Sequence, residues 1–302
     1  MSKTASLFGC APGERLLIIH ADDAGMCHSA NAATIRAMTE GVVSSASVMV
    51  PCPWFPEMAA WARENPQMDI GVHLTLTSEW KHYRWGPVAP REKVPGLIDE
   101  AGFLWPRVAD VVAHATAEEV EIEARAQIER ALQFGMAPTH IDSHMGTLFS
   151  HPDFFAVYVR LSREYGIPAM LPRPTPEQIE RVDGARWVAE QIQTLESQGY
   201  LFLDRLILSL DGDTYEARRE SLRSTLRRLE PGVTQLIVHL LDDDPEARHV
   251  TGSWHIRYWE MQLFTDPKTR ELLAEEGIRL VGYRPLAAAW PACSRGPRAG
   301  GG

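Results

Sequence analysis

Two adjacent carboxylates close the first strongly apolar run of the chain. Residues 16–21 read Leu-Leu-Ile-Ile-His-Ala, and Asp22 and Asp23 follow directly. A run this apolar predicts a strand buried on both faces, and catalytic groups gather at the C-terminal ends of parallel strands. The pair could supply a general base or a metal ligand, or it could simply cap the helix after a turn. Which of these roles applies depends on the side chains that lie beside the pair at the same edge of the sheet.

Two later segments bring histidines to strand ends. His73 lies in the apolar run 70–76, where a buried imidazole needs a hydrogen-bond partner or a metal. Residues 139–144 read Thr-His-Ile-Asp-Ser-His. Alternation along a strand places the polar side chains of this segment on one face, namely His140, Asp142 and His144. Such a set suits either a divalent metal ion or a polar hydrogen-bond network.

Two further residues are candidates for contact with a substrate. His239 ends a run that reads Gln-Leu-Ile-Val-His, and its imidazole could donate a proton to a leaving group. Arg173 stands between two prolines and could hold a carboxylate by a bidentate contact, or form an ordinary surface salt bridge.

These residues require an ordered set of parallel strands. Strand-like runs alternate with helix-like segments along the whole chain, which predicts a mainly parallel α/β fold. The eight predicted strands are 16–21, 43–50, 69–76, 139–143, 168–171, 205–210, 234–241 and 278–283. Eight βα units in about 290 residues favour a single-domain, TIM-like (β/α) barrel, regular or irregular, over a doubly wound sheet. No glycine-rich nucleotide loop follows the first strand.

One helix is predicted in detail. Over 117–134 a charged face with Glu118, Glu119, Glu123, Arg125 and Arg130 opposes an apolar face with Val120, Ala124, Ile128 and Leu132. Thr116 and Glu119 are spaced for a capping box, and Gly135 supplies the stop.

The domain prediction has three parts. Residues 1–13 form an N-terminal extension, 14–290 the barrel, and 291–302 a mobile tail rich in Gly, Arg and Pro. The barrel carries a long insertion at 78–115 that contains three tryptophans, at 80, 85 and 105. Connections of this length are usually functional, so the insertion is expected either to cover a site and stack on sugar rings or to pack its aromatics on the barrel's flank.

Composition excludes several classes of protein. The 302 residues include 30 basic and 40 acidic side chains, and the formal charge of −10 argues against a nucleic-acid partner. No apolar run approaches the roughly 20 residues of a membrane span. The four cysteines form no C-x-x-C pair and are expected to be reduced thiols, which predicts a soluble, cytoplasmic protein. A homo-oligomer is compatible with the apolar segments around Trp54 and Trp254.

The ordered motifs Ala21-Asp22-Asp23, Gly71-Val72-His73-Leu74 and 139–144 resemble those of the YdjC-like carbohydrate deacetylases, which include chitooligosaccharide deacetylases. The similarity runs from Arg15 to about Tyr283 and includes the segment Arg257-Tyr258-Trp259-Glu260. The resemblance implies a metal-dependent hydrolase that removes an acetyl group from an N-acetylated sugar or oligosaccharide.

The resemblance also assigns roles. It implies that a divalent metal, Mg or Zn, is held by Asp23, His73 and His144. It implies Asp22 as the base and His239 as the acid. Beside these assignments, the residues themselves suggest that His140 and Asp142 would orient His144 or the base, and that Arg173 would contact substrate.

The chain departs from the family pattern at two places. Many relatives carry more histidines after His144, where this chain has Met145-Gly146-Thr147, and many have proline where this chain has Leu240.

Two alternative functions remain open. One alternative is another metal-dependent hydrolase on the same barrel, a phosphoesterase or a deacylase of non-sugar substrates. The other is a non-catalytic carbohydrate-binding protein.

Overall fold

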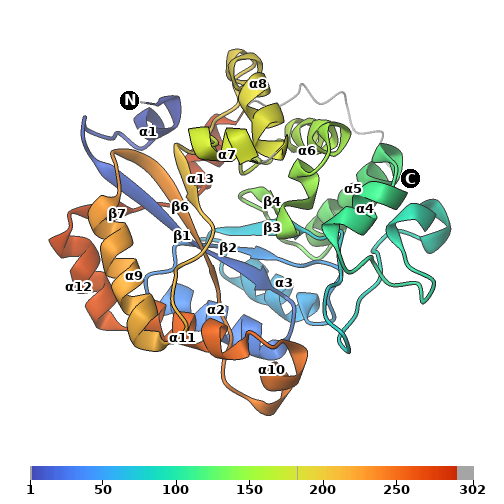
Figure 1. Cartoon of the computed structure of the whole chain (residues 1–302), viewed down its shortest axis with the longest axis horizontal. Helices are drawn as coiled ribbons and strands as arrows, with labels where there is room; N and C mark the ends of the chain where they lie inside the picture. Colours follow the sequence, from blue (N-terminus) through green and yellow to red (C-terminus); the bar gives the residue numbers. More distant parts are fainter. Residues whose placement is uncertain (1, 182, 291–302) are drawn as a thin grey trace.

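A curled sheet of parallel strands forms the centre of the molecule (Figure 1). The computed structural model describes residues 2–181 and 183–290. The strands within them are β1 (Arg15–Ala24), β2 (Ser45–Val48), β3 (Ile70–Leu74), β4 (Ile141–Ser143), β5 (Arg205–Ile207), β6 (Gly232–His239) and β7 (Ile278–Leu280). Their order is β4-β3-β2-β1-β6-β5, and β7 also pairs with β1. The predicted class, an irregular α/β barrel, is confirmed as a half-barrel of parallel strands.

Helices surround the sheet on its outer side (Figure 1). They are α1 (Lys3–Leu7), α2 (His28–Thr39), α3 (Phe55–Glu64), α4 (Val108–His114), α5 (Ala117–Gln133), α6 (Pro152–Tyr165), α7 (Pro176–Arg181), α8 (Asp183–Ser197), α9 (Tyr215–Arg228), α10 (Pro245–Val250), α11 (Trp254–Thr265), α12 (Pro267–Glu275) and α13 (Arg284–Ala289). Short 3-10 turns lie at Arg91–Lys93, Pro95–Leu97 and His144–Phe149. None of these described helices combines the length and apolarity that a bilayer crossing requires.

The predicted strand at 168–171 is wrong. This segment makes only isolated bridges, from Ile141 to Ala169 and from Pro172 to Leu203. Prolines at 168, 172 and 174 have no N–H to donate, so a continuous ladder cannot form there. The bridges nevertheless link the β4 edge to the segment before β5, and the sheet therefore curls around a common interior.

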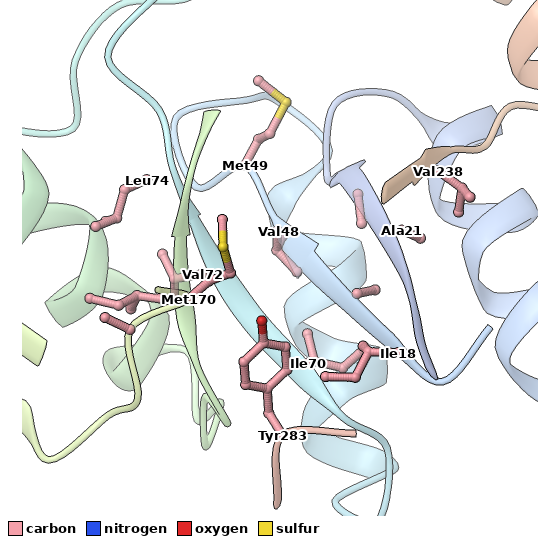
Figure 2. Packing of buried hydrophobic residues seen from close by; sticks show 14 of the residues in the cluster. Ile18, Ala21, Val48, Met49, Ile70, Val72, Leu74, Met170, Val238 and Tyr283 are labelled. Atoms are coloured by element: carbon pink, nitrogen blue, oxygen red, sulfur yellow. The ribbon is translucent and has the colours of Figure 1, made fainter. Parts of the chain in front are cut away.

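The strands are apolar on one face and polar on the other. Ala46, Val48, Ile70 and Val72 are buried on the outer face of β2 and β3 (Figure 2). The alternate positions face the interior of the half-barrel, where Ser45 and Ser47 of β2 both contact the His20 ring of β1, at 3.0 and 3.1 Å. Because successive side chains of a strand point to opposite faces, these short strands place apolar side chains in the core and polar side chains in the interior of the half-barrel.

Helix α5 begins and ends where the sequence predicts. The Thr116 side chain accepts a hydrogen bond from the Glu119 N–H, and the Glu119 carboxylate accepts one from the Thr116 N–H, which completes the capping box. The assignment of two residues to faces is wrong, because Glu123 is fully buried and Leu132 is 41% exposed. The Glu123 carboxylate accepts hydrogen bonds from the backbone N–H groups of Val88 and Ala89, at 2.9 and 2.8 Å. The buried stripe of α5 thus includes a carboxylate that anchors the insertion.

The aromatic residues of the insertion at 78–115 lie in two different environments. Trp85 is buried and donates its indole N–H to the Thr77 carbonyl at 2.9 Å, as a core residue does. Trp80 instead lines the pocket described below. The boundaries predicted at residues 13 and 290 stay predictions, and the predicted tail at 291–302 lies outside the described residues.

Candidate active site

Five predicted side chains converge at the C-terminal ends of the strands. Asp22 and Asp23 lie near the end of β1, His73 lies in β3, His144 directly follows β4, and His239 ends β6. All five line one pocket of about 730 Å³. The fold therefore brings together residues that are separated by more than 200 positions in the chain.

Three of these residues present donor atoms that face one another. The Asp23 Oδ1 lies 3.5 Å from the His73 Nε2 and 3.3 Å from the His144 Nδ1, and the two nitrogens are 3.2 Å apart. A tetrahedral ion with ligands at roughly 2.0–2.1 Å separates ligand atoms by about 3.4 Å. The Asp23 Oδ1 is also buried without a hydrogen-bond partner. Spacing, donor type and this unsatisfied oxygen all fit a divalent metal ion.

Carboxylates hold both histidines from behind. The His73 Nδ1 lies 2.7 Å from the Asp142 Oδ1, and the His144 Nε2 lies 3.1 Å from the Glu79 Oε2. A metal-binding histidine commonly contacts a carboxylate through its second nitrogen, which fixes the ring and raises its basicity. Asp142 thus lies behind His73, whereas the sequence analysis expected it to orient His144 or the base.

The charged groups of the cluster shift one another's pKa values. Burial alone would raise the pKa of Asp23, but the Arg257 charge and the close imidazoles of His144 and His73 hold that pKa well below its ordinary value. Burial alone would lower the pKa of His144, yet the carboxylates of Glu79 and Asp23 raise it to about 9. The opposing charges of Asp142 and Asp22 likewise raise the pKa of His73. A cation that binds here must displace these protons.

Asp22 stands beside the triad and remains available for proton transfer. Its Oδ2 lies 3.8 Å from the His73 Nε2, and its Oδ1 lies 3.2 Å from the His20 Nε2 without hydrogen-bond geometry. The His20 Nε2 also contacts the Asp142 Oδ2 at 2.9 Å. Burial would lower the pKa of His20, but Asp142 and Asp22 raise it to about 9. A cationic His20 therefore lies between the carboxylate that orients His73 and the candidate base.

His239 faces the same space from the neighbouring strand. Asp22 and His239 are register partners in the β1 and β6 ladder, and the His239 Nε2 lies 4.0 Å from the Asp23 Oδ2. The His239 side chain is 35% exposed, unlike the ligand candidates. Partial removal of the imidazole from water and the nearby Arg257 charge lower the pKa of His239. The backbone N–H of His239 donates to the Glu260 carboxylate at 2.8 Å, which fixes the end of β6.

The turn that presents the two aspartates is unusual. Asp23 has a φ of 66°, in the left-handed region that a residue with a side chain seldom adopts. The Arg257 guanidinium donates to the Asp23 Oδ2 at 2.8 Å, and the Met26 N–H donates to the Asp23 carbonyl at 3.3 Å. These contacts hold the backbone and the carboxylate of Asp23 at the mouth of the half-barrel.

Three residues of the site were not identified from the sequence. Glu79 opens the insertion, His20 precedes the aspartate pair in an apolar run, and Arg257 lies 234 positions from its partner Asp23. Only Arg257 carried a signal, as the first residue of a segment that resembles the family. A contact made across so many positions leaves no local pattern to detect.

Two predicted residues do not line the pocket. His140 is buried beside His20, with the ring centroids 4.9 Å apart, and it stacks on Tyr283 at 4.0 Å and contacts the Thr139 hydroxyl at 3.0 Å. Arg173 pairs with Glu196 and lies over the Phe202 ring at 5.4 Å. The structure brings neither side chain to the pocket wall.

Comparison with known proteins agrees with this geometry. A family model described as "YdjC-like protein" matches residues 16–275. A carbohydrate deacetylase of Thermus thermophilus is 33% identical over 272 residues, which cover 87% of this chain and 91% of that protein. A carbohydrate deacetylase of Enterococcus faecalis is 31% identical and covers 90% of this chain and 98% of its own.

A solved structure is similar along nearly the whole chain. It is an Enterococcus faecalis protein provisionally described as a cellobiose-phosphate cleavage protein, with a TM-score of 0.75 and 28% identity. The match covers 90% of this chain and 99% of that one. The motifs, the half-barrel and the extent of these matches lead to one conclusion: this chain belongs to the YdjC-like family.

Proposed function

We propose that this protein is a metal-dependent hydrolase that removes the acetyl group from an N-acetylated amino sugar. The observation that carries the proposal is the triad of Asp23, His73 and His144, with Asp22 and His239 facing it from adjacent strands. Relatives along nearly the full length of the chain are named carbohydrate deacetylases, which supports the choice of substrate.

The three ligands would hold a divalent metal, and their chemistry favours zinc over magnesium. Two imidazole nitrogens and one carboxylate are a common zinc set, whereas magnesium prefers oxygen donors throughout. When bound, the metal would polarise the amide carbonyl and lower the pKa of a water molecule.

The remaining residues supply the proton transfers. Asp22 accepts a proton from the attacking water, because its carboxylate is next to the triad but outside it. His239 donates a proton to the departing nitrogen, since an amine leaves only when protonated. His20 positions Asp22, and Arg257 donates to the Oδ2 of Asp23, so that Oδ1 is the oxygen that would be free to hold a metal.

The charge of the pocket favours an acetylated sugar over a phosphate ester. Among the described residues that line it, Asp22, Asp23 and Glu79 are carboxylates, and the one guanidinium, Arg257, is paired with Asp23. Apart from the metal itself, a phosphate dianion would find no unpaired guanidinium or ammonium group among these lining residues. A neutral N-acetyl sugar needs no such counter-charge.

We also propose that the protein works in a reducing compartment such as the cytoplasm. Cys10, Cys27 and Cys52 are free and buried, and burial raises the pKa of each thiol. Neutral buried thiols of this kind are inert and suit a reducing environment.

Acetate release from N-acetylglucosamine oligomers, measured alongside phosphate release from generic phosphoesters, tests the proposal. Acetate without phosphate supports it, and phosphate without acetate overturns it. In the same assay Asp22→Asn should bind as much metal as the parent and lose most of its activity. An active Asp22→Asn protein would reject Asp22 as the base.

A further inference from the structure

The pocket is lined by two chemically different sets of side chains. The ionisable residues described above come mainly from β1, β3 and the residues just after β3 and β4. The apolar residues come mainly from elements that connect β4 to β5 around the open side of the sheet, namely the 3-10 turn after β4, the 168–174 segment, α8 and β5, with one further residue from β6. They are Phe149, Met170, Val188, Leu206, Leu208 and Ile237. In Figure 1, α7 and α8 lie together beside α6, at the margin of the sheet. The site therefore continues from a polar centre into an apolar arm, defined here by those six residues.

Exposed apolar side chains in this pocket indicate a surface that binds an apolar group. Six large apolar side chains are exposed among the described residues, and two of them, Leu208 at 59% and Met145 at 52%, line this pocket. Val188 and Ile237 line the same pocket and are themselves buried, so part of the apolar wall is packed against the protein. Exposed apolar surface in a concave site gains free energy when an apolar group covers it.

A second sugar ring fits this arm poorly. Each sugar hydroxyl that leaves water needs a hydrogen-bond partner, or it costs free energy. On this side the pocket wall offers few polar side chains, chiefly Ser150 and Gln178. An alkyl or aryl group makes no such demand, and burial of its surface is favourable.

We propose that the substrate is an N-acetylated amino sugar that carries an apolar aglycone, with the aglycone bound in the apolar arm. This inference rests on the proposed function, because the acetamido group must reach the metal triad for the aglycone to reach the arm. The volume of about 730 Å³ leaves room for both parts, since it falls within the roughly 300–1,000 Å³ typical of ligand pockets.

The test compares methyl and octyl N-acetyl-β-glucosaminide, the latter below its micelle concentration. We expect kcat/KM for the octyl glycoside to exceed that for the methyl glycoside by at least about tenfold, as burial of two methylene groups would give. Leu208→Ser should reduce this ratio severalfold, mainly through KM. Leu132→Ser is the matched control, because Leu132 is 41% exposed on α5 and does not line the pocket; it should keep the ratio.

Several results would overturn the proposal. A ratio near one would show that the arm binds no part of the substrate. A higher kcat/KM for N-acetylglucosamine tetramers would show that it binds further sugars. Preferred cleavage of N-octanoylglucosamine would show that it binds a long acyl chain. A dimer that dissociates in Leu208→Ser, together with a ratio near one, would assign it to a second copy of the chain.

Binding separates this inference from the proposed function. Calorimetric titration of both glycosides into Asp22→Asn measures affinity without turnover. Tighter binding of the octyl compound supports the apolar arm even if no acetate is ever released, in which case only the proposed reaction fails. Equal affinity would refute the arm.

Discussion

His73 and Asp142 are register partners on adjacent parallel strands, and the His73 Nδ1 lies 2.7 Å from the Asp142 Oδ1. The other oxygen of Asp142 accepts a hydrogen bond from Ser47 at 2.8 Å and lies 2.9 Å from His20. One buried carboxylate thus orients a candidate metal ligand and supports the histidine next to the candidate base. Since β-ladder register sets which side chains are neighbours, the pairing of β3 with β4 is itself part of the active site.

Asp142→Asn should weaken metal binding by about 10- to 100-fold, because the amide holds His73 less firmly and makes it less basic. Competition with a chelator of known affinity measures the change. Asp213→Asn, at an exposed aspartate that does not line the pocket, is the control. Unchanged metal affinity in Asp142→Asn would show that His73 does not depend on this carboxylate.

His239→Ala should slow amide cleavage far more than cleavage of an activated ester. An amine leaving group needs a proton, whereas p-nitrophenolate leaves without one, and general acid catalysis contributes roughly 10²- to 10⁴-fold. The ratio of kcat on N-acetylglucosamine oligomers to kcat on p-nitrophenyl acetate gives the answer. Equal losses on both substrates would remove His239 from the role of acid.

Removal of the metal should lower thermal stability. A ligand at 100 times its dissociation constant stabilises the folded state by about 2.7 kcal/mol, so dialysis against a chelator should lower Tm by several degrees. His73→Ala and His144→Ala should abolish the metal-dependent part of the shift. His28→Ala, at an exposed histidine that pairs with Glu57, should retain it. A chelator shift that survives in both ligand variants would place the metal elsewhere.

Stability should fall as pH rises through the range in which Glu123 ionises. Burial raises the pKa of Glu123 from 4.5 to about 7, although hydrogen bonds from Ala89, Val88 and Gln127 limit the rise. Between these values the folded chain binds a proton that the unfolded chain has lost. The free energy of unfolding therefore decreases with pH across that window, by up to roughly 3 kcal/mol.

Urea unfolding at pH 4.5 and pH 7.5 measures the effect. Glu123→Gln should flatten the difference between the two pH values, because an amide does not titrate. Glu118→Gln, at an exposed position of the same helix, should leave the parent's difference intact. If Glu123→Gln kept the full slope, other groups would account for it.

The sequence determined much of the fold through local patterns. Apolar runs located seven strands, because a strand buried in a parallel sheet needs a continuous apolar sequence. The Thr116 and Glu119 capping box located the start of α5 within one turn of chain. The eighth expected strand failed because prolines at 168, 172 and 174 cannot donate to a ladder, and Glu123 was misplaced because its covering partner is an insertion that periodicity does not reveal.

The sequence alone also identified the candidate ligands, because Asp23 follows an apolar run, His73 lies within one, and His144 ends the alternating polar segment 139–144. Only the tertiary structure decided their partners. Glu79 behind His144, His20 between Asp22 and Asp142, and the Arg257 charge on Asp23 join positions up to 234 apart. Those pairings depend on strand register and on the path of an insertion and a late helix. Only the folded chain fixes these, because no short stretch of sequence contains both partners.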